Sequence, residues 1–139
     1  MARRFGPPSS PPSRVSVGLT FDTGALISLE RRRQRIARAY TTAMADGVPV
    51  TVPAVVVAEW WRGRSEAREI ILRGVRVEDT TPALARLAGE ALAAVPGAGA
   101  IDALVMASAA RRGDIVYTSD FADLERLQVY FPTVRLLAV

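Results

Sequence analysis

Four acidic residues stand where the neighbouring sequence is apolar. Asp22 follows the run "VGLTF", Asp120 follows "IVYTS", Glu59 lies inside "AVVVAEWW", and Asp102 opens "IDALVMASAA". Burying a carboxylate costs several kcal/mol unless a partner compensates its charge. If the four side chains converge, their mutual repulsion adds to this cost, and a divalent cation would offset it. The acids are therefore candidate metal ligands.

The residue types that are missing narrow the chemistry further. The chain has no His, no Cys and no Lys, and all 18 of its basic residues are Arg. Imidazole, amine and thiol catalysis are therefore excluded, and so is an RNase that uses two histidines. Proton transfer must fall to carboxylates, tyrosines or metal-activated water. Oxygen ligands alone select Mg²⁺ or Mn²⁺ over zinc, and four acids leave open whether one or two ions bind.

Each acid also has a simpler local explanation. Asp22, Asp102 and Asp120 all lie where a helix is predicted to begin, and a carboxylate there caps or stabilises the free backbone N–H groups. Asp123 competes with Asp120 for a role in the site, and Glu59 could lie on an exposed helix face. Four such coincidences are less economical than one shared site, which is the interpretation we favour.

The basic residues give a weaker signal. Three of the four excess positive charges lie near the N-terminus, at Arg3, Arg4 and Arg14, so the high isoelectric point is poor evidence for nucleic-acid binding. The segment "ERRRQRIAR" has three interpretations: a solvated face, a phosphate-tracking surface, or a docking site for an acidic partner. Arg62 and Arg64 follow Glu59 closely and are candidate substrate contacts. The pair Trp60-Trp61 is assigned to packing rather than to base stacking.

Strands and helices are predicted to alternate over residues 15–139, which we expect to form one domain. Residues 1–14 are rich in Pro, Ser and Arg and are predicted to be a disordered tail. The predicted strands are residues 15–21, residues 49–52, "VRVED", "IVYTSD" and "VRLLAV". The predicted helices are residues 24–46, which the Arg run could break, "AVVVAEWWRG" ending at Gly63, "EAREIILRG" capped by Ser65, residues 81–94, "IDALVMASAARRG", and a short helix ending at Leu127.

This alternation predicts an α/β fold with a central, mostly parallel sheet of about five strands covered by helices. In such sheets ligands bind beyond the carboxyl ends of the strands, near the point where strand order reverses. Asp22 and Asp120 each follow a predicted strand and would project from this same edge. The fold class therefore offers a reason for carboxylates that leave an apolar run.

The four acidic segments also carry a family resemblance. "FDTGAL", "VVAEWWRG", "IDALVMASAA" and "YTSDFADLERL" resemble the four acidic motifs of the PIN domain, and the chain is similar in size to VapC-type ribonuclease toxins. The resemblance covers residues 15–139 and implies a PIN-like α/β/α sandwich. It implies that Asp22, Glu59 and Asp102 are the principal metal ligands and that Asp120 is the fourth acid. Glu59 and Asp120 would bind directly or through water.

The same resemblance implies supporting residues. Thr23, together with Thr118 or Ser119, would help to position water or phosphate. It also implies a function: a Mg²⁺- or Mn²⁺-dependent endoribonuclease that is the toxin of a toxin-antitoxin pair. The expected partners are an RNA substrate, a VapB-like antitoxin and a second copy in a homodimer.

Two further expectations concern location and an alternative function. We expect a cytoplasmic protein without a membrane span, because no apolar stretch approaches ~20 residues and no apolar signal-peptide centre is present. The alternative is a non-catalytic PIN-like fold that binds RNA or a protein partner as a scaffold. Metal dependence of RNA cleavage would separate the two functions.

Overall fold

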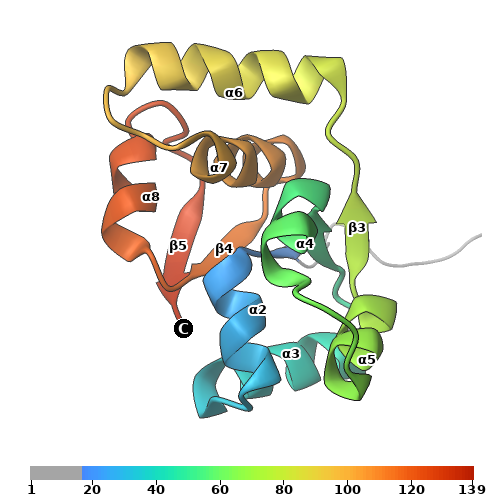
Figure 1. Cartoon of the computed structure of the whole chain (residues 1–139). Coiled ribbons are helices and arrows are strands. Elements are labelled where there is room, and N and C mark those ends of the chain that lie inside the picture. The colour runs from blue at the N-terminus through green and yellow to red at the C-terminus, as the bar shows by residue number, and fades with distance from the viewer. Residues whose placement is uncertain (1–16) are drawn as a thin grey trace, which may run out of the picture.

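The computed structural model describes residues 17–139 and contains a counterpart of every predicted strand and helix (Figure 1). The predicted tail, residues 1–14, lies outside the described residues. The strands are β1 (Leu19–Phe21), β2 (Val50–Pro53), β3 (Arg76–Glu78), β4 (Ile115–Thr118) and β5 (Arg135–Ala138). The helices are α2 (Thr23–Glu30), α3 (Gln34–Asp46), α4 (Ala54–Trp60), α5 (Glu66–Gly74), α6 (Pro82–Ala94), α7 (Ala100–Arg112) and α8 (Phe121–Leu127). Within this described part of the chain, no helix is both long and apolar enough to cross a membrane.

The five strands form one parallel sheet in the order β3-β2-β1-β4-β5. Leu19 of β1 lies opposite Val50 of β2 on one side and Ile115 of β4 on the other. The predicted α/β fold with a parallel sheet is therefore confirmed. From β1 the chain adds β2 and β3 in one direction, and it later adds β4 and β5 in the other. The strand order reverses between β1 and β4, which is where ligands bind in open sheets of this kind.

Helices cover both faces of the sheet, as parallel strands require. On one face α7 packs on β1, β2 and β4, and α6 packs on α7; α3 and α5 lie on the opposite side (Figure 1). The fully buried Phe21 of β1 contacts the rings of Tyr40 and Tyr117, with centroid distances of 6.4 and 5.7 Å. This packing fixes the end of β1, and with it the position of the residue that follows.

The helix predicted over residues 24–46 breaks at the Arg run, as expected. α2 ends at Glu30, and α3 begins at Gln34. Between them Arg32 has a φ of 58°, in the left-handed region that ends a right-handed helix. α3 then ends at Asp46, and its C-cap residue Gly47, which has a φ of 69°, acts as the predicted stop.

The predicted end of the next helix is wrong by three residues. α4 ends at Trp60 instead of continuing to Gly63. Arg62 explains this early end, because its side-chain Nε donates to the backbone carbonyl of Glu59 at 2.8 Å. A side chain thus satisfies a carbonyl that the next helical turn would have used. Pro53 is the last residue of β2 and the N-cap residue of α4.

A polar network joins β1, β3, α7 and the residue that precedes β4. The Arg112 guanidinium lies 2.9 Å from Asp114, 2.8 Å from the Thr20 hydroxyl and 2.7 Å from Glu78. Asp114 is only 5% exposed, and Thr20 also donates to it at 2.8 Å. One arginine therefore compensates two carboxylates from separate elements.

We expect Arg112→Leu to lower the free energy of unfolding by about 3 kcal/mol, because it leaves a buried carboxylate without its cation. Urea unfolding at neutral pH measures this loss. The matched control is Arg111→Leu, since the neighbouring Arg111 is exposed; its effect should stay within about 0.5 kcal/mol. Equal losses in the two variants would contradict the assignment of the network.

Candidate active site

Four acidic side chains from separate parts of the chain line one pocket of about 470 Å³. Asp22 follows β1, Asp120 follows β4, Glu59 is the penultimate residue of α4, and Asp102 lies in the first turn of α7. The structure thus brings together all four of the predicted site acids. The pocket is completed by Thr23, Gly99, Ala100, Ile101 and Val105.

Asp22 both caps a helix and lines the pocket. Its Oδ1 accepts the Ala25 N–H at 2.8 Å, which makes Asp22 the N-cap of α2. The residue is 4% exposed, and the hydroxyl of the buried Thr118 stabilises its negative charge. The Thr118 hydroxyl also accepts the backbone N–H of Asp120 at 2.7 Å. The simple capping explanation is therefore correct for Asp22, and Thr118 links the ends of β1 and β4 within the site.

Glu59 reaches the same pocket from the end of α4. It is exposed, as the alternative explanation from the sequence allowed. Thr23 Oγ1, however, donates to Glu59 Oε1 at 2.5 Å. This hydrogen bond holds the side chain of Glu59 beside the start of α2, next to Asp22. Thr23 therefore orients an acid of the pocket.

Asp123 and Ser119, the other candidate site residues near Asp120, lie outside the acidic pocket. Asp120 is the N-cap residue of α8 but makes no side-chain capping bond, so capping does not account for its carboxylate. Asp123 has a side chain that is 60% exposed and lies 3.8 Å from Arg126. Ser119 lines a separate hollow beside Gly24. Of these three, only Asp120 lines the acidic pocket.

Gly24 permits the close approach of two segments that carry acids. A Cβ on Gly24 would lie 1.7 Å from Ser119 Oγ and 2.5 Å from Ser119 Cβ. Real Cβ atoms do not approach other atoms so closely, so any larger residue would push the start of α2 away from the loop after β4. The glycine of the "DTG" segment thus keeps Asp22 next to Asp120.

The electrostatics of the pocket reflect crowded negative charge. The pKa of Asp22 is raised to about 6, chiefly by burial and also by the nearby charges of Asp120 and Asp102, against hydrogen bonds that lower it. The pKa of Asp102 is likewise raised to about 6, chiefly by burial, with added repulsion from Asp120, Asp123 and Glu59. Perturbed carboxylates that meet in a pocket are typical of functional sites.

The donor set suits a hard divalent cation. Four carboxylates supply oxygen ligands alone, which Mg²⁺ and Mn²⁺ prefer. The raised pKa values of Asp22 and Asp102 arise partly from negative charges that a bound cation would offset. Among residues 17–139, no three acids are grouped tightly enough to enclose an ion in the present conformation.

We expect the metal-free protein to lose stability as the pH rises from about 4 to about 7. The ordinary pKa of an aspartate is 3.8, whereas the pKa of Asp22 in the folded protein is about 6, so the folded state binds the proton more tightly in this window. The shift corresponds to roughly 2–3 kcal/mol between the ends of the window. Asp22→Asn keeps a good N-cap and should reduce this dependence, whereas the contribution of Asp102, whose pKa is also raised to about 6, should remain.

Urea unfolding in EDTA at a series of pH values measures the effect. Asp22→Asn should be more stable than wild type at pH 7 and similar to it near pH 4. The exposed Asp46→Asn serves as the control with the same change of charge. A pH dependence that Asp22→Asn leaves unaltered would argue against the raised pKa.

The two arginines predicted to contact substrate are separated in the structure. Arg62 lines a hollow of about 300 Å³ that shares Thr23 and Glu59 with the acidic pocket. Arg64 has a side chain that is 82% exposed and pairs with Glu69 at 2.9 Å. Arg62 is therefore placed beside the candidate site, whereas Arg64 is held by a neighbouring acid.

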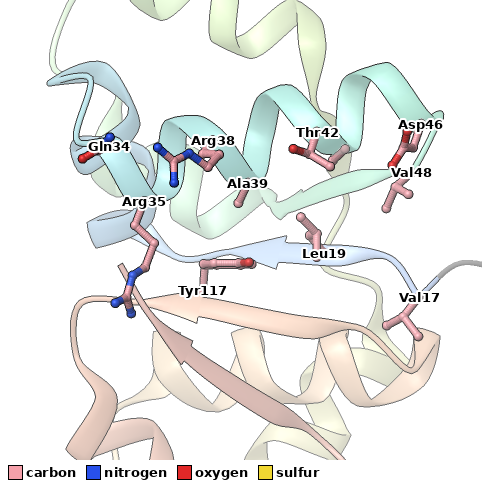
Figure 2. Close-up of a pocket in the computed structure, with 11 residues that line it drawn as sticks. Val17, Leu19, Gln34, Arg35, Arg38, Ala39, Thr42, Asp46, Val48 and Tyr117 are labelled. Carbon is pink, nitrogen blue, oxygen red and sulfur yellow. The ribbon is translucent and has the colours of Figure 1, made fainter.

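A larger hollow, of about 580 Å³, lies between α3 and the sheet. Figure 2 shows Arg35 and Arg38 of α3 together with Leu19 and Tyr117 of the strands beneath them. Its single acidic lining residue is Asp46. A metal site needs more than one carboxylate, and this hollow has only Asp46. The acidic pocket is smaller, but it remains the candidate active site because four acids line it.

Two residues that shape the site were not predicted from the sequence. Gly24 was not distinguished from other turn residues, because its close contact with Ser119 joins segments far apart in the chain. Arg31 was treated only as part of an Arg run, yet it lines the hollow beside the acidic pocket. A signal for Arg31 was present: Thr23, Ile27 and Arg31 are spaced by four residues and so share one helix face.

Comparisons with known proteins bear on the fold and the family of the chain. No curated protein sequence matches the chain. Among solved structures, a chain of the DNA-bound VapBC of Salmonella typhimurium is 17% identical, with a TM-score of 0.70 over 88% of this chain and 98% of that one. VapBC2 of Rickettsia felis, bound to a DNA fragment from its promoter, gives 13% identity and a TM-score of 0.69 over 87% and 98%. FitAcB of Neisseria gonorrhoeae is 18% identical, with a TM-score of 0.55 over 86% of this chain and 96% of that one.

These identities are low, so the likeness to solved structures establishes the fold alone. The sequence itself matches the family model of the PIN domain over residues 19–129. This match begins with β1 and extends beyond α8, and it includes all four acids of the pocket. The chain belongs to the PIN-domain family.

Proposed function

We propose that the protein is a metal-dependent endoribonuclease of the VapC type and the toxin of a toxin-antitoxin pair. The observation that carries this proposal is the convergence of Asp22, Glu59, Asp102 and Asp120 on one pocket at the β1–β4 reversal. A scaffold has no use for concentrated negative charge where a phosphate must approach. A nuclease can use this negative charge to bind divalent cations, and the bound cations would then attract the phosphate that the bare carboxylates repel.

In this proposal the four carboxylates hold Mg²⁺ or Mn²⁺, Asp22 and Asp102 directly and Glu59 and Asp120 directly or through water. The bound cation would lower the pKa of a water molecule and stabilise charge on the leaving oxygen. Thr23 fixes the rotamer of Glu59 through their hydrogen bond. Hydrolysis adds water across one P–O bond of the RNA, and the leaving oxygen takes up a proton. No histidine is required for these steps.

The partner proposals rest on the structural neighbours. The neighbours described as VapBC2, VapBC and FitAB are each bound to DNA, and this likeness supports a VapB-like antitoxin as the partner of this chain. We also propose a homodimer and a cytoplasmic location, as the family resemblance implies. The alternative function remains a non-catalytic PIN-like scaffold that binds RNA or protein.

The experiment that tests the proposal is cleavage of a mixed pool of structured RNAs by purified protein. Cutting is expected with Mg²⁺ or Mn²⁺ and should stop in EDTA. The fragments would begin to identify the substrate. Folded protein, free of antitoxin, that shows no metal-dependent cutting would contradict the ribonuclease and favour the scaffold.

A further inference from the structure

A second, cationic hollow opens beside the acidic pocket. It has a volume of about 300 Å³, lies between α2, α4 and α5, and shares Thr23 and Glu59 with the acidic pocket. Its remaining lining residues are Ile27, Glu30, Arg31, Trp60, Arg62 and Arg68. Three arginines, Arg31, Arg62 and Arg68, therefore lie next to the four carboxylates of the acidic pocket. The three differ in whether an acid of the fold already neutralises their charge.

Arg68 is already neutralised within the fold. Its guanidinium lies 3.1 Å from Glu30 and donates to the carbonyl of Gly63 at 2.7 Å. Glu30 in turn accepts the indole N–H of Trp60 at 3.1 Å. These contacts fix two nitrogens of the Arg68 guanidinium, whereas its Nε is buried without a hydrogen-bond partner in the described part of the chain. The charges of Arg68 and Glu30 cancel, so they add little net attraction for an anion.

Arg31 and Arg62 carry the uncompensated charge. Arg62 uses its Nε to bind the Glu59 carbonyl at 2.8 Å, which fixes the side chain and leaves its two terminal nitrogens for a ligand. Arg31 is exposed, and its side chain makes no hydrogen bond or ion pair within residues 17–139. One arginine thus comes from the end of α2 and the other from just beyond α4.

We propose that this hollow binds a backbone phosphate of the RNA strand adjacent to the phosphate that is cleaved. The proposal rests on the proposed ribonuclease function and extends it to the path of the substrate. One divalent cation leaves four carboxylates with net negative charge, so an RNA strand needs further cations on its way into the pocket. Arg31 and Arg62 line the adjoining hollow, and they offer the planar N–H pairs that bind phosphate oxygens well.

The hollow recognises charge rather than base identity. Trp60 is only 3% exposed and its indole N–H is engaged by Glu30, so it offers no free face on which a base could stack. Phosphate contacts position a strand without specifying sequence. Any sequence preference of the enzyme must therefore arise elsewhere on its surface.

The test measures binding and cleavage separately. Binding of a fluorescent single-stranded RNA is followed by anisotropy over a range of salt, in the Asp22→Asn background with Mg²⁺, so that the probe stays intact. Arg31→Gln and Arg62→Gln should each weaken binding about tenfold and reduce the salt slope by about 0.7. With Asp22 intact, the same substitutions should raise KM while changing kcat little.

Arg32→Gln and Arg86→Gln are the matched controls, because they remove the same charge outside the hollow. Arg32 lines a different hollow and Arg86 is an exposed residue of α6, so both variants should bind RNA as the parent does. An RNA with one neutral methylphosphonate next to the cleaved bond should lose as much affinity as Arg62→Gln, and the two losses should not add.

Wild type that cleaves RNA with metal, together with Arg31 and Arg62 variants that bind and cut like their controls, would overturn the phosphate site and leave the ribonuclease intact. The phosphate site would also be overturned if the Arg31 and Arg62 variants bound RNA normally but lost binding to an acidic peptide. That result would make the hollow a protein-docking site. Absence of cleavage by wild type contradicts the proposed function itself, so the two failures are distinguishable.

Discussion

Asp22→Asn is expected to lower metal-dependent RNA cleavage by about a thousandfold while the protein remains folded. Asp22 is the most buried acid of the pocket and directly follows β1, at the reversal of strand order. Asparagine keeps the shape of the side chain and its capping role, but it removes the negative charge that would hold the cation. The single-turnover cleavage rate at saturating Mg²⁺ measures the loss.

Two further measurements make this result specific. Thermal unfolding should show that Asp22→Asn is at least as stable as wild type without metal at pH 7, because the variant removes a carboxylate whose burial is unfavourable. Asp46→Asn, which changes an exposed acid outside the pocket, should cleave normally. If Asp22→Asn retained cleavage within tenfold of wild type, Asp22 would not be a principal metal ligand.

Gly24→Ala is expected to reduce cleavage by about a hundredfold, since displacements near 1 Å at a reacting centre have effects of this size. The added Cβ would overlap both side-chain atoms of Ser119. Relief of the overlap must separate the start of α2 from the loop after β4, and so move Asp22 away from Asp120. We also expect a loss of about 2 kcal/mol in the free energy of unfolding. Cleavage rates and urea unfolding report the two effects.

The matched control removes the opposing side chain. Ser119→Gly eliminates both of the closest clashing atoms, although the Ser119 backbone N–H would remain 3.3 Å from the new Cβ. The double variant Gly24→Ala/Ser119→Gly should therefore recover most of the lost activity. Gly89→Ala, at a position where an added Cβ meets nothing within 4 Å, should be harmless. Failure of Ser119→Gly to rescue would show that the close approach is not what limits residue 24.

The sequence by itself determined the order of the elements and the chemistry available to them. Apolar runs of strand length alternate with amphipathic segments, and local signals such as Ser65, Thr81 and Gly47 mark helix ends because capping depends on neighbouring residues alone. The absence of His, Lys and Cys limits the site to oxygen chemistry in any fold. Asp22 and Asp120 could be placed at one sheet edge because both follow parallel strands.

Only the tertiary structure decided which residues share the pocket. Glu59 and Asp102 lie on helices, and periodicity cannot say which way a helix turns its acids toward a sheet. The choice of Asp120 over Asp123 depended on where α8 begins and which face it presents. Gly24 lies against Ser119, and Arg31 lines the same hollow as Arg62, although the residues of each pair are distant in sequence. Local patterns carry no information about such contacts, because packing of the whole sheet and its helices sets those distances.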